Sequence, residues 1–184
     1  LRRGFKNSLL IVRSMLDRHA FRRYYRGESE RDPNGSWEDH KFNHSLFDIL
    51  MGVFAREDKN RAFSHLDALR EALLHLMCED QQFIDAIELS TSVADMVKRR
   101  FDKWRHAVEA VLADTRVSPR CFTLKLKEAL WASDPTCKIC GQRIQAVDDA
   151  ALDHIKQYWQ GGQTIPENAR LTHRFCNWAR ARNA

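Results

Sequence analysis

Two short motifs near the end of the chain constrain its folding more than any other feature. They are Cys137-Lys138-Ile139-Cys140-Gly141 and His173-Arg174-Phe175-Cys176. Each motif places two sulfur or nitrogen ligands three positions apart, a spacing that folds both ligands onto one tetrahedral Zn²⁺. If both pairs bind the same ion, the chain between them has to turn back on itself. The spacing therefore predicts a small fold closed by a structural zinc.

The five cysteines are not expected to form disulfides, because the sequence shows no secretory leader. No charged and then apolar stretch precedes a small-residue cleavage site, so we expect a cytoplasmic protein, or a piece of a longer intracellular one. A single C-x-x-C motif would also suit a redox centre, but that needs a preceding strand and a helix N-terminus at the first thiol. Cys78 and Cys121 are expected to be core thiols on apolar helix faces.

Residues 1–131 show a helical pattern rather than a metal-binding one. Seven Gly and four Pro leave little turn chemistry for a sandwich or barrel. Apolar side chains recur at helical spacing in six segments: residues 8–25, 36–54, 61–78, 80–89, 93–112 and about 119–131. We therefore expect this part of the chain to be a bundle of helices.

Turn signals separate these segments and mark a domain boundary. Ser36, with an acidic residue three positions later, resembles a capping box and predicts a helix N-terminus. The stretch 27–35 contains Asp-Pro-Asn-Gly, which predicts a loop. Pro135 cannot continue a helix. The sequence thus predicts a mainly α protein, with a helical bundle domain over residues 1–132 and a small α+β domain over residues 133–184.

Charge is segregated along the chain. Residues 1–27 hold eight Lys or Arg and one acidic residue, residues 28–97 hold six and fifteen, and residues 98–184 hold sixteen and nine. The net charge of +5 is therefore the sum of +7, −9 and +7 in these three segments, which suggests that the two ends of the chain face a polyanion. Solvated helix faces are the alternative explanation. No run of eighteen apolar residues is present, so no membrane span is expected.

Further motifs lie between and after the two cysteine motifs. They read D-H-I at residues 153–155, G-G-x-T at 161–164, N-x-x-L at 168–171, and Asn177 directly after Cys176. In this order, and with the cysteine motifs, they make the segment from about Pro135 to Arg182 resemble the HNH endonuclease family. The resemblance implies a ββα-metal fold with a structural zinc. It also implies metal-dependent hydrolysis of DNA phosphodiester bonds by an endonuclease or nickase.

The resemblance assigns roles to four residues. His154 is the general base that accepts a proton from the attacking water, since a histidine with an ordinary pKa of about 6.5 can be neutral at physiological pH. Asp153 and Asn177 hold a catalytic Mg²⁺ or Mn²⁺, for which carboxylate and amide oxygens are suited. Asn168 ties down the loop and orients the base. Asn177 stands where the family usually has His, which makes this an H-N-N variant.

Two assignments stay open at this point. In HNH nucleases without cysteine motifs, a His at the position of His173 can bind the catalytic ion. Here Cys137, Cys140 and Cys176 would otherwise form a three-ligand site, so we expect His173 on the structural zinc. The alternative for the whole segment is a zinc knuckle that binds nucleic acid without cutting it.

Basic residues close to the end of the chain are candidates for contacts to DNA phosphates: Arg170, Arg174, Arg180 and Arg182. Gly161 and Gly162 would allow either a close approach to a phosphate or only a tight turn.

The helical part resembles a different group of proteins. Segments 47–54, 80–87 and 97–101 resemble, in their order and apolar spacing, the helical region before the nuclease in GmrSD-like phage-defence proteins. This resemblance implies the effector part of an anti-phage restriction system. Its partner would be an N-terminal NTPase or sensing domain that this chain lacks. A plain scaffold that presents the nuclease is the alternative.

Overall fold

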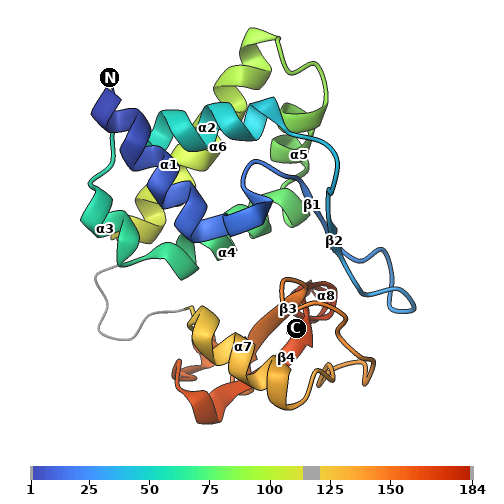
Figure 1. Cartoon of the computed structure of the whole chain (residues 1–184). Helices are drawn as coiled ribbons and strands as arrows, with labels where there is room; N and C mark the ends of the chain where they lie inside the picture. The colour runs from blue at the N-terminus through green and yellow to red at the C-terminus, as the bar shows by residue number, and fades with distance from the viewer. Residues whose placement is uncertain (1, 114–120, 183–184) are drawn as a thin grey trace. The chain divides into compact units, whose positions relative to one another are not determined.

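The computed structural model of the chain describes residues 2–113 and 121–182 (Figure 1). These residues are mainly α-helical with two two-stranded sheets, which confirms the predicted fold class. Packing divides the chain into two compact units. The first comprises Leu1–Tyr24 and Trp37–Thr115, and the second comprises Tyr25–Ser36 and Arg116–Ala184. No helix in the described part of the chain combines the length and apolarity needed to cross a membrane.

The first unit, named the helical unit below, is built from six described α-helices. They are α1 (Arg2–Leu16), α2 (His44–Phe54), α3 (Lys59–Phe63), α4 (Leu66–Glu79), α5 (Gln81–Glu88) and α6 (Ala94–Ala113), with the 3₁₀ turn η1 (Asp17–His19) after α1. Their apolar faces meet in one core, whose fully buried side chains include Ile11, Leu50, Phe54, Leu73 and Trp104. Burial of such side chains supplies the stability of this unit.

The predicted helix over residues 8–25 ends early. α1 stops at Leu16, and Asp17 then adopts a left-handed backbone with φ of 46°, which is incompatible with a continuing helix. The chain goes on to form β1 (Tyr24–Tyr25), which pairs with β2 (Ser36–Trp37). The prediction that the helix continues to residue 25 was wrong, because the aromatic residues after Leu16 lie in a turn and a strand.

The predicted helix over residues 36–54 begins later than expected. Its N-cap is Asn43 rather than Ser36, and the Asn43 side chain accepts a hydrogen bond from the backbone N–H of Leu46 at 2.9 Å. The predicted segment 61–78 is divided between α3 and α4, because Ser64 and His65 interrupt it. The segments expected at 80–89 and 93–112 correspond to α5 and α6.

The last predicted helix, over about residues 119–131, corresponds to α7 (Leu124–Ser133). Thr123 caps α7 by accepting a hydrogen bond from the backbone N–H of Leu126 at 3.3 Å. Pro119, the predicted start, lies outside the described residues. Cys121 precedes α7, so its expected place on a helix face was wrong, whereas Cys78 is buried on α4 as predicted.

Two features fix the helices of the helical unit against one another. Arg100 of α6 is buried and donates hydrogen bonds to the carboxylate of Asp48 at 3.1 Å and to the backbone oxygen of Thr91 at 2.6 Å. A Cβ at Gly52 would lie 2.8 Å from the ring of Phe101, so glycine permits the close approach of α2 to α6. A larger residue at position 52 would push these helices apart.

The second unit, named the ββα unit, contains the end of the chain. Its described elements are α7, β3 (Ala150–His154), the 3₁₀ turns η2 (Tyr158–Gln160) and η3 (Pro166–Asn168), β4 (Ala169–His173) and α8 (Arg174–Arg182). β3 and β4 pair antiparallel, with Asp153 opposite Arg170. The buried core is small and consists of Cys137, Ile144, Ala150, Leu171 and Cys176. Trp131 of α7 covers it and donates a hydrogen bond from Nε1 to the Ile144 oxygen at 3.1 Å.

An N-terminal segment also belongs to the ββα unit. The loop between β1 and β2 lies at residues 26–35, which agrees with the predicted loop at 27–35. The Arg26 guanidinium lies 4.0 Å from the ring centroid of Trp178 in α8. Gln142 donates a hydrogen bond to the Glu30 oxygen at 2.9 Å. The compact units thus have other bounds than the domains expected at 1–132 and 133–184, because this segment and α7 pack with the C-terminal residues.

Candidate metal cluster and active site

The four residues of the cysteine motifs come together in space. Cys137 and Cys140 precede β3, His173 ends β4, and Cys176 lies in the first turn of α8. Their ligand atoms all lie within 4.8 Å of one another. Nδ1 of His173 is 3.4 Å from Sγ of Cys140 and 3.8 Å from Sγ of Cys176. Three thiols and one imidazole form the donor set of a closed tetrahedral zinc site, so this cluster fits Zn²⁺.

The local sequence explains why the first motif folds into a ligand-bearing turn. Gly141 has a φ of 75°, a conformation that L-residues with side chains rarely adopt. The turn closes with a hydrogen bond from the Gly141 N–H to the Cys137 oxygen at 2.9 Å. Lys138 then donates its N–H to the Leu171 oxygen at 2.9 Å, which attaches the turn to β4. Gly141 of the C-x-x-C-G motif therefore allows the tight turn that carries Cys137 and Cys140.

Hydrogen bonds and burial set the protonation of these ligands. Burial raises the pKa of Cys137, but hydrogen bonds from the His173 side chain and from backbone N–H groups outweigh it and lower this pKa to about 6. Burial, together with the charge of Cys137, raises the pKa of Cys176. Burial would lower the pKa of His173, yet its hydrogen bond and ion pairing with Cys137 raise it. The hydrogen bond between Cys137 and His173 thus favours the charged form of both side chains.

Asp153 is held by two arginines. Arg170, its partner in the β3–β4 register, donates from Nε at 2.8 Å and from Nη2 at 2.6 Å. Arg180 of α8 donates from Nη1 to the same carboxylate. Only 12% of the Asp153 side chain is exposed. The predicted metal ligand is therefore already engaged in a compact ion-pair cluster.

His154 follows Asp153 in β3 and makes different contacts. Nε2 lies 2.9 Å from the hydroxyl oxygen of Thr164. The centroid of the imidazole is 4.4 Å from that of the Phe122 ring and 5.7 Å from that of Tyr158. These contacts fix the orientation of the imidazole. Asp153 and His154 thus have different partners, as is usual for neighbouring side chains in a strand, which point to opposite faces.

Asn168 closes the loop that follows His154. Its side chain accepts a hydrogen bond from the Lys156 N–H at 2.8 Å and donates to the oxygens of Lys156 at 3.1 Å and Gln163 at 2.8 Å. A Cβ at Gly162 would lie 1.8 Å from the Lys156 oxygen, so only glycine fits there. Gly161, with a φ of 81°, ends η2. The Gly-Gly pair thus has a role in a tight turn.

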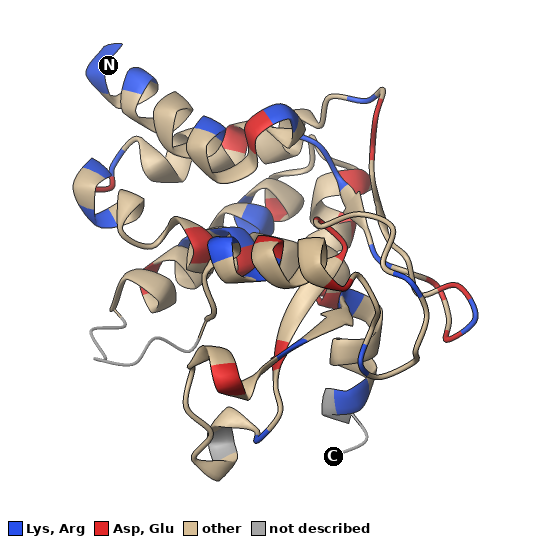
Figure 2. Cartoon of the chain, turned by 60° about the horizontal axis from the view of Figure 1, so that its bottom comes forward, with Lys and Arg blue, Asp and Glu red and all other residues tan. Residues whose placement is uncertain are grey.

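The other predicted site residues lie in α8. Asn177 is half-buried, one residue after Cys176 and three residues before Arg180, whose guanidinium contacts Asp153. Arg174 donates from Nε to the Asp148 oxygen at 2.7 Å. The side chain of Arg182 lies outside the described residues, and Figure 2 shows Lys and Arg in blue on the last helix before the C-terminus.

A two-stranded hairpin, a following helix and a Cys₃His cluster define a zinc-binding type of ββα unit, with an Asp-His pair in its first strand. Residues 137–182 match the family model described as HNH endonuclease. Comparisons with curated proteins and with solved structures found no match. The match supports assignment of this segment to the HNH family. An HNH domain indicates nuclease activity on nucleic acid and a metal site.

Sequence reasoning missed several residues around the site. Thr164 ends the G-G-x-T motif, so its motif position was a usable signal for its contact with His154. Phe122 lies before α7 in no motif, and only the fold places its ring against His154. Arg26 is more than one hundred residues from Trp178, and nothing in the sequence pairs them.

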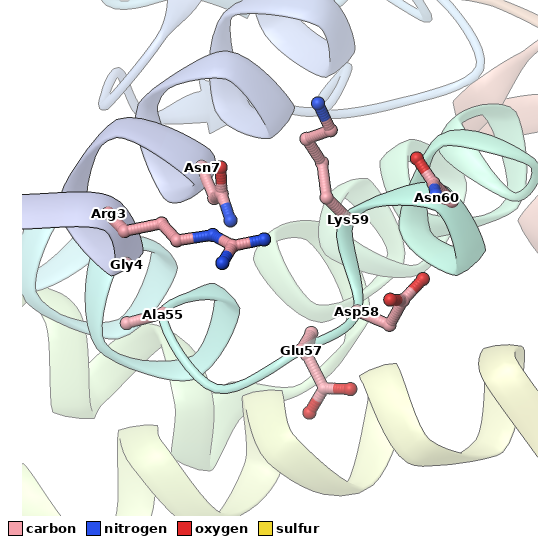
Figure 3. A pocket seen from close by; sticks show the side chains of 8 residues that line it. All are labelled: Arg3, Gly4, Asn7, Ala55, Glu57, Asp58, Lys59 and Asn60. Carbon is pink, nitrogen blue, oxygen red and sulfur yellow. The ribbon is translucent and has the colours of Figure 1, made fainter.

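A separate pocket lies in the helical unit. Its volume is about 550 Å³, and Arg3, Asn7, Glu57, Asp58 and Lys59 are among its lining residues. Figure 3 shows Arg3 and Asn7 reaching from α1 toward the turn that carries Asp58. Its acidic and basic side chains are balanced, and none of the predicted site residues lines it. The pocket is therefore not the candidate nuclease site.

Proposed function

We propose that the ββα unit is a divalent-metal-dependent DNA endonuclease or nickase. The observation that carries this proposal is the way Asn168 holds the loop after His154. Its three hydrogen bonds join Lys156 to Gln163 and fix the segment that supports the Asp153-His154 pair. A rigid support for adjacent acidic and imidazole groups favours catalysis, which requires fixed geometry.

His154 is proposed to act as the general base. It takes a proton from a water whose oxygen attacks the phosphorus, while the bond from phosphorus to the 3′ oxygen breaks and that oxygen gains a proton from solvent. Thr164 and Phe122 keep the imidazole in place during this transfer. Asp153 and Asn177 offer the carboxylate and amide oxygens that Mg²⁺ or Mn²⁺ prefers, and the ion would stabilise charge on the phosphate and the leaving oxygen.

Cleavage of supercoiled plasmid by the full chain tests this proposal. In Mg²⁺ or Mn²⁺ we expect nicked or linear product, and His154→Ala should lower the rate about 10²-fold or more. His40→Ala is the matched control, because His40 is exposed and lies in the helical unit. Full activity in His154→Ala, or no product with either ion, would contradict the proposal.

Binding without cleavage is the second candidate function. The observation that favours it is the pairing of Asp153 with Arg170 and Arg180, since the carboxylate already has partners. This candidate predicts that the chain retards a DNA duplex in a gel but yields no product in either ion. Product formation that depends on His154 would exclude it.

We further propose that the chain is the effector part of an anti-phage restriction system in the cytoplasm. The support is the resemblance of its helices to those before the nuclease in GmrSD-like proteins, which implies an NTPase or sensing domain as partner. Cells that carry the complete system should resist phage infection, and His154→Ala should abolish the resistance. Unchanged plaque counts with and without the system would contradict this role.

A further inference from the structure

The ion-pair cluster of Asp153, Arg170 and Arg180 has a geometry that bears on metal binding. Both arginines engage the same oxygen, Oδ2, and all three groups are mostly buried: the exposed fractions of the side chains are 12% for Asp153, 23% for Arg170 and 29% for Arg180. Charges that are partly removed from solvent are screened less than exposed ones. Their interactions therefore influence any ion that approaches the carboxylate.

The cluster carries a net positive charge. Two guanidinium groups face one carboxylate, and this carboxylate is the group on which the proposed function places a divalent cation. A free cation thus meets two positive charges and a ligand that is already hydrogen-bonded. The cluster disfavours the metal ion as long as both arginines stay in place.

We propose that Arg170 and Arg180 withhold Asp153 from a divalent ion until a phosphate of nucleic acid takes up their guanidinium groups. This inference rests on the proposed function and adds a form of regulation to the same site. Phosphate oxygens accept paired N–H groups of arginine as carboxylates do, so the DNA backbone is a competing acceptor. Metal and phosphate then bind cooperatively, and each raises the affinity of the other by the same factor.

The first experiment measures Mn²⁺ binding to the zinc-loaded full chain without DNA, by electron paramagnetic resonance of free Mn²⁺. Arg170→Gln and Arg180→Gln should each bind Mn²⁺ roughly threefold to tenfold more tightly than the unchanged chain. Lys125→Gln is the matched control, because it removes a positive charge from an exposed position of α7 in the same unit. We expect its Mn²⁺ affinity to stay within about twofold.

The outcomes separate the inference from the proposed function. Unchanged or weaker Mn²⁺ binding in both arginine variants overturns the inference, since the arginines would then merely orient Asp153. Asp153→Asn tests the metal site itself. If it leaves Mn²⁺ binding unaltered, the proposed metal ligand is wrong and the inference fails with it. The zinc content of each variant verifies that the ββα unit is folded.

The second experiment approaches the cluster from the DNA side. Asp153→Asn leaves both guanidinium groups without a carboxylate, so the variant should bind a fluorescent DNA duplex roughly threefold more tightly in buffer without divalent ions. Glu167→Gln removes an exposed carboxylate of the same unit and controls for the change in net charge. Equal effects of Asp153→Asn and Glu167→Gln would overturn the inference, because no specific release of arginines would be needed to explain them.

Discussion

The two units of this chain are stabilised in different ways. The helical unit has a large core of buried aliphatic and aromatic side chains from α1, α2, α4, α5 and α6. The core of the ββα unit has five buried residues, and two of them, Cys137 and Cys176, belong to the candidate zinc cluster. We expect so small a core to offset the chain entropy lost on folding only with a further constraint such as a metal ion. We therefore expect the first unit to fold without a metal and the second to depend on one.

The largest effect should come from removing a zinc ligand. Cys137→Ser is expected to abolish zinc binding and unfold the ββα unit, because a structural zinc contributes on the order of 10 kcal/mol. The helical unit should stay folded. Zinc content by mass spectrometry and two-dimensional amide NMR spectra measure both effects. Cys121→Ser, which changes a cysteine of the same unit outside the cluster, should keep its zinc. A ββα unit that stays folded in Cys137→Ser would show that this unit does not depend on zinc.

The reverse test truncates the core of the helical unit. Leu73 is fully buried in α4, so Leu73→Ala should lower the free energy of unfolding of this unit by about 2–5 kcal/mol. Thermal melting with and without a zinc chelator measures it. In the unchanged chain and in Leu73→Ala alike, the chelator should leave the melting temperature of the helical unit unchanged. It should remove the melting transition of the ββα unit. A chelator-sensitive helical unit would show that its stability also depends on the metal.

The zinc affinity of the ββα unit is expected to fall as the pH falls. Zinc binds thiolates and neutral imidazole, whereas the raised pKa values of His173 and Cys176 favour the protonated forms of these groups in the metal-free unit. At any pH below the pKa of a ligand group, zinc has to displace a proton from that group, and each such proton lowers the zinc affinity about tenfold per pH unit. Below about 6, the pKa of Cys137, a further proton is displaced and the fall becomes steeper. Competition with a zinc-binding dye at several pH values measures this slope, and a flat profile would contradict it.

The same contrast explains how much could be predicted from the sequence. The zinc ligands were predictable because the geometry of one ion dictates their spacing, and Cys137 and Cys176 do converge. The arginines of Asp153 were not, because the β3–β4 register places Arg170 and the packing of α8 places Arg180. Periodicity gave the helices of the core but overran the end of α1 at Leu16. Local turn geometry decides that boundary, and apolar spacing does not reveal it.

The smallest predicted effect concerns the segment at residues 25–36, which tests whether zinc alone holds the ββα unit together. Arg26→Ala removes the guanidinium from the Trp178 ring and should lower the stability of this unit by about 0.5–1 kcal/mol. Hydrogen exchange of the α8 amides in the zinc-loaded chain measures the change.

Arg31→Ala is the control, because Arg31 is an exposed residue of the same segment. If Arg26→Ala and Arg31→Ala give equal exchange rates, the metal and the small core suffice, and the segment only lies against the unit. Faster exchange in Arg26→Ala alone would mean that α8, which carries Asn177 and Arg180, owes part of its order to a residue far away in sequence. A fragment that begins at residue 133 would then be less stable than the same residues within the full chain.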